Sequence, residues 1–291
     1  MVKKKSDKRV IILTIVVIIG ALFLINVISN AIGNFETAKT KRVSVINVYG
    51  EISGQKVGGL FSVGQSSHDL VKRINEANQD SSIDAVLFRI DSPGGTPVAS
   101  HEIVRAIKAL DKPSVAVIRD VGASGAYWVA SATDFVVSDE LSLTGSVGVL
   151  GGFFDIHEFL ERYNISYERF TGGEYKDLGS PFREITEVER ELLQTKIDMM
   201  HDFFLEDVRQ LRNLDERQFE EVRTGIYFIG LEAINLGLVD QLGNEDFAVS
   251  WLEEELEGNV RLIERQERTS LFGTLAGMSL NPFSQSFIML R

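Results

Sequence analysis

The clearest hydrophobic pattern in the chain is an uninterrupted apolar stretch near its start. Residues 10–28 read VIILTIVVIIGALFLINVI and contain no charged side chain. As a helix rising about 1.5 Å per residue, this stretch spans roughly 28 Å, which is close to the thickness of a bilayer core. The pattern therefore predicts a transmembrane anchor over residues 10–30.

The charges beside this stretch predict its orientation. Residues 1–9 hold five basic side chains and one acidic side chain, and such basic flanks stay in the cytoplasm. Residues 31–42 then form a polar stalk outside the cell membrane. A cleaved signal peptide is the alternative, with Ser29-Asn30-Ala31 as a weak cleavage site, but its apolar region would be shorter, about 7–15 residues. We expect an uncleaved single-pass anchor that carries an extracytoplasmic domain.

After the stalk, short apolar runs alternate with amphipathic helical patterns. The run AVLFRI, residues 85–90, is typical of a strand buried on both faces. Strands are predicted at residues 43–49, 85–90, 114–118, 135–138 and 166–170, and helices at residues 67–79, 97–110, 124–132 and 187–211. This alternation predicts an α/β fold with a mostly parallel sheet, forming one domain over residues 43–268.

The end of the chain, residues 269–291, has a different pattern. Residues 269–290 are uncharged and rich in large apolar side chains. Gly273, Gly277 and Pro282 interrupt them, so a second membrane span is not predicted. We expect an apolar tail that docks on a groove or on the lipid surface.

Composition and charge exclude some kinds of function. The chain of 291 residues has no cysteine, which excludes disulfides, thiolate metal ligands and a cysteine nucleophile. The net charge is −12 although the N-terminal segment is basic, so the body of the protein is strongly acidic. Such a body repels phosphate backbones, and nucleic acid is not an expected partner.

Two glycine-rich segments follow predicted strands. DSPGG, residues 91–95, precedes a helix, and its backbone N–H groups suit an anion or a developing oxyanion. Read alone, it is more simply a tight turn. GASGA, residues 122–126, places Ser124 at a sharp strand-to-helix turn, where the N–H groups of Gly94 and Gly125 can face one oxyanion. Read alone, Ser124 is more simply a helix N-cap.

A serine nucleophile needs a general base, and the chain offers histidine and lysine for this role. None of the four histidines lies in a glycine-rich or strand-end segment, but a Ser-His-Asp triad is recognised by geometry and stays open. The four histidines are His68, His101, His157 and His201. A lysine acts as a base only if burial lowers its pKa toward neutrality.

One lysine and one hydroxyl stand out for this role. Lys176 lies in the loop GGEYKDLGSP, residues 172–181, and read alone it is a solvated surface lysine. Ser146 lies in LTGSVGV, residues 143–149, where a buried hydroxyl can orient a neutral lysine. The same segment is also explained as a buried strand and turn.

Together and in this order, four motifs resemble the signal peptide peptidase A family in its short bacterial and archaeal form. They are DSPGG (91–95), GASGAYW (122–128), LTGSVGV (143–149) and YKDLGSPFR (175–183). The resemblance covers about residues 43–245. The family shares a clan with the Clp-type proteases and the crotonases, so the resemblance implies repeated β-β-α units after the anchor.

The resemblance implies an endopeptidase with a Ser-Lys dyad. It matches Ser124 to the nucleophile and Lys176 to the general base. It matches Ser146 to the hydroxyl that holds the lysine, and Gly94 and Gly125 to the oxyanion donors. No metal or cofactor is implied. It also implies a homo-oligomeric ring with sites shared between subunits, and substrates that are signal-peptide remnants and other hydrophobic peptides at the membrane.

Three other functions are weighed against this one. Related Ser-Lys proteases that cut stomatin-like membrane proteins have nearly the same motifs. A crotonase-type enzyme acting on acyl-coenzyme A has a similar oxyanion hole, but it needs neither a serine at 124 nor a lysine at 176. A non-catalytic scaffold is disfavoured, because both dyad positions hold the required side chains.

Overall fold

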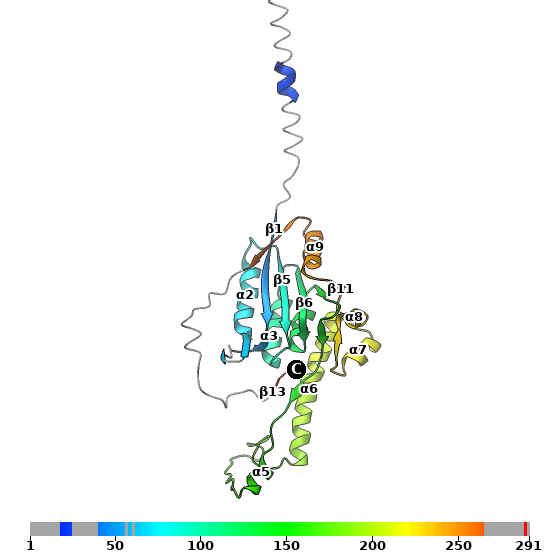
Figure 1. The fold of residues 1–291 in the computed structure, drawn as a ribbon. Coiled ribbons are helices and arrows are strands. Elements are labelled where there is room, and N and C mark those ends of the chain that lie inside the picture. Colours follow the sequence, from blue (N-terminus) through cyan, green and yellow to red (C-terminus); the bar gives the residue numbers. More distant parts are fainter. Residues whose placement is uncertain (1–17, 25–39, 56–57, 60–61, 265–287, 290–291) are drawn as a thin grey trace, which may run out of the picture. The chain divides into compact units, whose positions relative to one another are not determined.

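The computed structural model describes residues 18–24, 40–55, 58–59, 62–264 and 288–289 (Figure 1). The chain divides into two units, Met1–Thr40 and Lys41–Arg291.

In the first unit, residues 18–24 are helical and their side chains are exposed. The rest of the predicted anchor, and residues 31–39 of the predicted stalk, lie outside the described residues. Among the residues that are described, no helix combines the length and the apolar character that crossing a membrane requires.

The second unit is built on an eight-stranded sheet with the order β10-β8-β6-β5-β1-β12, in which β7 joins β6 to β11. All of these pairs are parallel except β8 with β10. The strands are β1 (Lys41–Tyr49), β5 (Ala85–Ser92), β6 (Ser114–Ala123), β7 (Phe135–Ser138), β8 (Leu143–Gly145), β10 (Tyr227–Ile229), β11 (Gln241–Leu242) and β12 (Val260–Glu264). The predicted mostly parallel sheet is confirmed.

Among the described residues, five further strands lie outside this sheet. Three of them pair with one another, namely β2 (Glu51–Ser53), β3 (Gly58–Gly59) and β4 (Ser62–Ser66). The other two, β9 (Leu150–Gly151) and β13 (Ile288–Met289), form an antiparallel pair. Apart from β13, the predicted apolar tail lies outside the described residues.

The four predicted helices are confirmed to within two residues at each end. They are α2 (Ser67–Gln79), α3 (Pro97–Lys108), α4 (Gly125–Ser131) and α6 (Glu187–Arg212). The described part of this unit has four further helices, namely α5 (His157–Arg162), α7 (Glu216–Val222), α8 (Gly230–Ala233) and α9 (Glu245–Glu255).

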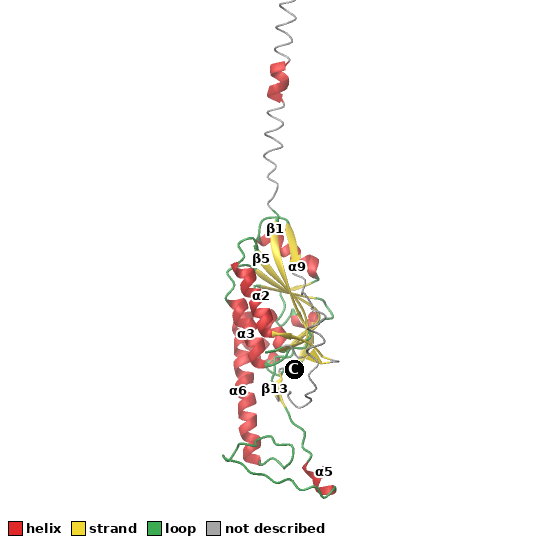
Figure 2. Ribbon diagram, turned by 90° about the vertical axis from the view of Figure 1, so that its left-hand side faces the viewer, coloured by secondary structure: helices red, strands yellow, loops and turns green. Residues whose placement is uncertain are grey.

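Helices cover both faces of the sheet, as β1 illustrates. Side chains alternate along a strand, so Ile46 and Val48 point to one face and Val43 and Val45 to the other. The first pair belongs to the larger apolar core, which α2, α3, α4 and α6 complete, and the second pair packs with Leu252 of α9. Figure 2 shows α2, α3 and α6 together on one side of the sheet.

Residues 152–186, which we call the arm, join β9 to α6. Figure 1 shows α5 and one end of α6 projecting away from the sheet. The strand predicted at residues 166–170 is wrong, because this segment is irregular and pairs with no described strand. Its aromatic composition favours a strand locally, but Phe170 is 93% exposed and finds no surface to pack on.

Candidate active site

Ser124 occupies a strained turn where β6 ends and α4 begins. Its φ of 55° and ψ of −126° lie outside the regions that non-glycine residues normally adopt. Its N–H donates to the Gly145 carbonyl at 2.8 Å, and its carbonyl accepts from the Trp128 N–H at 3.0 Å. The Ser124 Oγ is buried and has no hydrogen-bond partner among the described residues. Buried polar groups are usually hydrogen-bonded, so an unpaired hydroxyl marks this turn as a candidate functional position.

Gly94 packs directly against this turn. It has a φ of +102°, and a Cβ there would lie 2.8 Å from the Gly125 nitrogen and 3.0 Å from the Ser124 Cβ. The Gly94 N–H donates to Ser92 Oγ over 3.2 Å, the long end of the normal range, and that hydroxyl donates to the Gly50 carbonyl at 2.5 Å. The structure thus brings the three predicted residues into contact, and their roles remain predictions.

Ser100 fills the space behind Gly125. It lies on α3 and is fully buried, and its Oγ has no hydrogen-bond partner in the described part of the chain. A Cβ on Gly125 would lie only 2.2 Å from this Oγ, whereas the Gly95 nitrogen would be 3.4 Å away. Ser100 therefore sets how closely α3 approaches the turn. The sequence analysis missed it, because a small buried residue on an amphipathic helix gives no signal of its own.

The chain leaves β8 at Ser146, beside the point where it leaves β6 at Ser124. In the parallel pairing of β8 with β6, Gly145 lies opposite Ala123, so the residues that follow them emerge at the same edge. Ser146 is half-buried with a φ of 50°, and its N–H donates to the Ile226 carbonyl at 3.0 Å. Its predicted role in orienting Lys176 stays a prediction.

Lys176 lies on the arm, and its side chain is exposed. Since the Ser124 Oγ has no hydrogen-bond partner among the described residues, the Lys176 amine does not reach it within this chain. Asp177, the next residue, is held by Arg169 and Arg183. A single chain therefore does not bring the predicted serine and lysine together.

No histidine bonds the Ser124 Oγ in the part of the chain that the structure describes. His101 stacks on the indole of α4, and burial lowers the pKa of its imidazole. His157 pairs with a carboxylate on the arm, His201 lies 3.1 Å from a backbone carbonyl, and His68 is exposed. Among these residues the geometry offers no Ser-His-Asp triad.

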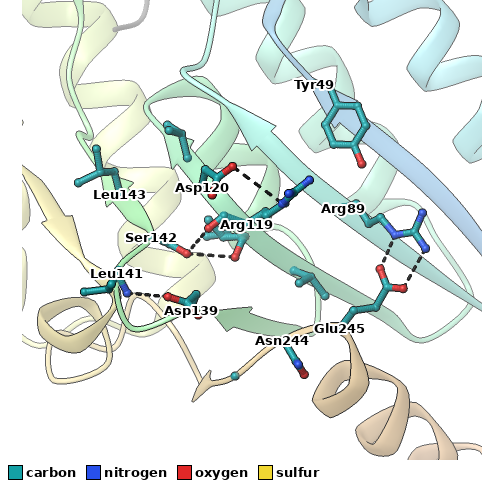
Figure 3. A pocket seen from close by; sticks show the side chains of 14 residues that line it. Tyr49, Arg89, Arg119, Asp120, Asp139, Leu141, Ser142, Leu143, Asn244 and Glu245 are labelled. Atoms are coloured by element: carbon teal, nitrogen blue, oxygen red, sulfur yellow. Dashed lines mark hydrogen bonds and ion pairs between the residues drawn. The ribbon is translucent and has the colours of Figure 1, made fainter.

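A pocket of about 910 Å³ lies between the ends of β5, β6 and β8 and the start of α9. Figure 3 shows Arg89 paired with Glu245 on one side of it and the apolar side chains of Leu141 and Leu143 on the other. None of the predicted site residues lines this pocket. We assign it no catalytic role.

Comparison with known proteins finds similar proteases. Residues 106–259 match the family model described as peptidase family S49. A protein assigned as a protease in Methanocaldococcus jannaschii is 32% identical over 208 residues, which cover 70% of this chain and 67% of that protein. One assigned as signal peptide peptidase SppA in Enterococcus faecium is 29% identical over 244 residues, 82% of this chain and 71% of that protein. A solved ClpP1 mutant from Listeria monocytogenes is more distant, with 15% identity and a TM-score of 0.45 over 69% of this chain and 91% of its own.

Proposed function

The chain belongs to peptidase family S49 and is a serine peptidase, and we propose that it cleaves peptide bonds with Ser124 and Lys176. The observation that carries this proposal is the buried, unpaired hydroxyl of Ser124 at a strained turn. Gly94 packs on that turn beside Gly125. An acyl-transfer enzyme needs such an arrangement of one nucleophile and adjacent backbone N–H donors.

The proposed reaction has two stages. The neutral Lys176 amine, oriented by Ser146, takes the Ser124 proton while the Oγ attacks the scissile carbonyl. The Gly125 N–H, and the Gly94 N–H once it exchanges its long bond to Ser92 Oγ for the substrate, hold the oxyanion, and Lys176 then gives its proton to the leaving amine. A water molecule gives its proton to Lys176 and attacks the acyl-enzyme. Release of the acid returns that proton to the Ser124 Oγ.

The lysine in this proposal comes from a neighbouring copy in a homo-oligomeric ring. The exposed position of Lys176, away from Ser124 of its own chain, supports this. The arm also carries large apolar side chains that are each more than half exposed. They are Phe154, Phe159, Tyr163, Ile165 and Phe170. Exposed large apolar side chains are common at protein interfaces, so the arm suits docking on a second copy.

The proposed substrates are signal-peptide remnants and other hydrophobic peptides, bound in extended form. The antiparallel pairing of β9 with β13 supports this, since it indicates that the edge of β9 accepts a further strand. β9 follows the segment that holds Ser146, so a strand at this edge runs near the proposed site.

We also propose that residues 10–30 anchor the chain in the cell membrane. The N-terminus then lies in the cytoplasm, and the catalytic domain, with repeated β-β-α units of the Clp and crotonase kind, lies outside. The support is the charge-free sequence of residues 10–28 beside a basic flank.

Washed membranes test substrate and anchor together. Cells making the full chain are lysed, and their membranes are extracted with carbonate. We expect the chain and its activity to stay in the pellet.

Peptide cleavage by these membranes is then measured by mass spectrometry. We expect kcat/KM to be at least about tenfold higher for a signal-peptide fragment than for a stomatin-like peptide. A soluble form lacking residues 1–31 would contradict the anchor. Preference for the stomatin-like peptide, or turnover of acyl-coenzyme A alone, would contradict the substrate class.

The contact between Gly125 and Ser100 predicts a compensating pair of substitutions. Gly125→Ala should lower kcat by about a hundredfold, because its methyl group meets Ser100 and displaces an oxyanion donor. Ser100→Gly in the same chain removes the opposing atoms and should recover about tenfold of that loss. The measurement is kcat for both variants, with Ser100→Gly alone as the control. A double variant no more active than Gly125→Ala would show that this contact does not set the geometry.

A further inference from the structure

Arg183 links the turn that carries Lys176 to the start of α6. Its Nε donates to Asp177 Oδ2 at 2.8 Å and its Nη2 donates to Oδ1 at 3.1 Å. On the other side its Nη1 donates to Glu189 Oε2 at 2.8 Å and to the Glu184 carbonyl at 3.1 Å, and its Nη2 also bonds Glu189. All three guanidinium nitrogens are therefore engaged, and a lysine side chain cannot reproduce this pattern.

Glu189 is fixed from its own helix as well. Its side chain accepts from the Thr186 N–H and from the Thr186 hydroxyl, both at 3.0 Å. Its own N–H donates to Thr186 Oγ1 at 3.3 Å, which closes the capping box of α6. The side chain of Glu189 is only 6% exposed. The Arg183 guanidinium, and after it Thr186, lowers the pKa of Glu189 to about 2. Glu189 therefore stays charged at every pH at which a lysine amine can be neutral, and the link to Arg183 persists there.

Asp177 is the other end of this link, and it neighbours the proposed base. The backbone bonds beside Lys176 are long, since its own N–H reaches the Gly173 carbonyl over 3.4 Å and the Leu178 N–H reaches the Tyr175 carbonyl over 3.2 Å. Only after Asp177 is a shorter bond made, from the Ser180 N–H to the Asp177 carbonyl at 2.9 Å. The Asp177 side chain is bound by Arg183 and also by Arg169 at 2.9 Å. These guanidinium groups, Arg183 first, lower the pKa of Asp177. The charge next to Lys176 is thus matched by two cations.

We propose that Arg183 is a positioning residue for the general base. It holds the Lys176 turn on α6, and it neutralises Asp177, so that the amine meets Ser124 of a neighbouring copy without an unbalanced carboxylate beside it. An unbalanced carboxylate favours the ammonium form of a lysine, and an ammonium group cannot accept a proton. This inference rests on the proposed function of Ser124 and Lys176.

Other charged groups lie around the cluster. On the arm, Glu174 accepts a hydrogen bond from Tyr175. On the first turn of α6, Glu187 and Arg190 form an exposed pair at 3.6 Å. No bond joins that pair to Asp177 among the described contacts, so Arg190 offers a matched arginine whose loss changes the charge of the helix but not the hold on the turn.

Opposite charge changes at two positions test the proposal. In the full chain, Arg183→Gln leaves an excess negative charge. We expect kcat to fall by about a hundredfold with KM nearly unchanged, and the pH of half-maximal kcat to rise by about one unit. Asp177→Asn leaves an excess positive charge, so that pH should fall. The double variant should return it to the wild-type value while kcat stays low.

Arg190→Gln is the control and should leave kcat and the pH profile unchanged. Thermal unfolding and sedimentation check that each variant folds and assembles. The inference is overturned if Arg183→Gln and Arg190→Gln both keep the wild-type kcat and pH profile while Lys176→Ala is inactive. If Lys176→Ala stays active, the proposed function fails instead. If Arg183→Gln does not fold, Arg183→Lys decides: low kcat at an unchanged half-maximal pH supports the proposal, and wild-type kcat overturns it.

Discussion

Replacing either Ser124 or Lys176 by alanine is expected to lower kcat toward a fluorogenic apolar peptide by at least about a thousandfold, because a nucleophile and its base act as a unit. Without the Ser124 Oγ no acyl-enzyme forms, and without the Lys176 amine no group takes its proton. Ser131→Ala is the matched control. That serine is also buried, lies at the other end of α4 and donates to the Trp128 carbonyl. It should keep kcat within about tenfold of the wild type.

Both inactive variants should stay folded. The Ser124 hydroxyl is buried without a hydrogen-bond partner in the described part of the chain, so its removal loses no hydrogen bond. Lys176 is exposed, and substitutions at such positions change stability little. The unfolding temperature should therefore match that of the wild type. Near-normal turnover by Lys176→Ala, together with an inactive variant at one of the four histidines, would show that the base has been assigned wrongly.

The sequence predicted the parts of the fold that depend on local apolar runs. β5 was found because its apolar residues bury on both faces of the sheet. β6 was predicted to end at residue 118 but continues to Ala123. The exposed side chains of Arg119 and Asp120 end the apolar run, and pairing with β8, together with the pairing of Gly122 with Ser92 of β5, extends the strand. Such pairing cannot be read from a local pattern.

The candidate site likewise contains residues that the sequence predicts and residues that only the structure reveals. The resemblance of short glycine-containing motifs to a known family singled out Ser124, Gly94 and Gly125, and the structure shows a turn that needs unusual backbone angles and close packing there. Ser100 was missed, since its closeness to Gly125 follows from how two helices meet. Arg183 is the last residue of the motif YKDLGSPFR, but its bonds to two carboxylates are visible only in three dimensions.

Mixing two inactive chains tests the central claim most directly. The claim is that Ser124 of one copy works with Lys176 of another. When Ser124→Ala and Lys176→Ala chains with different tags are co-expressed, a site is intact only where the second chain supplies the serine and the first supplies the lysine. Random assembly in a closed ring should then restore about a quarter of the wild-type activity.

The control pairs the Ser124→Ala chain with one that carries both substitutions, which leaves no intact serine. Recovery in the first mixture, none in the control, and co-purification of both tags is the predicted result. Mixed assemblies that hold both tags yet hydrolyse the peptide no faster than either variant alone would contradict a site shared between copies.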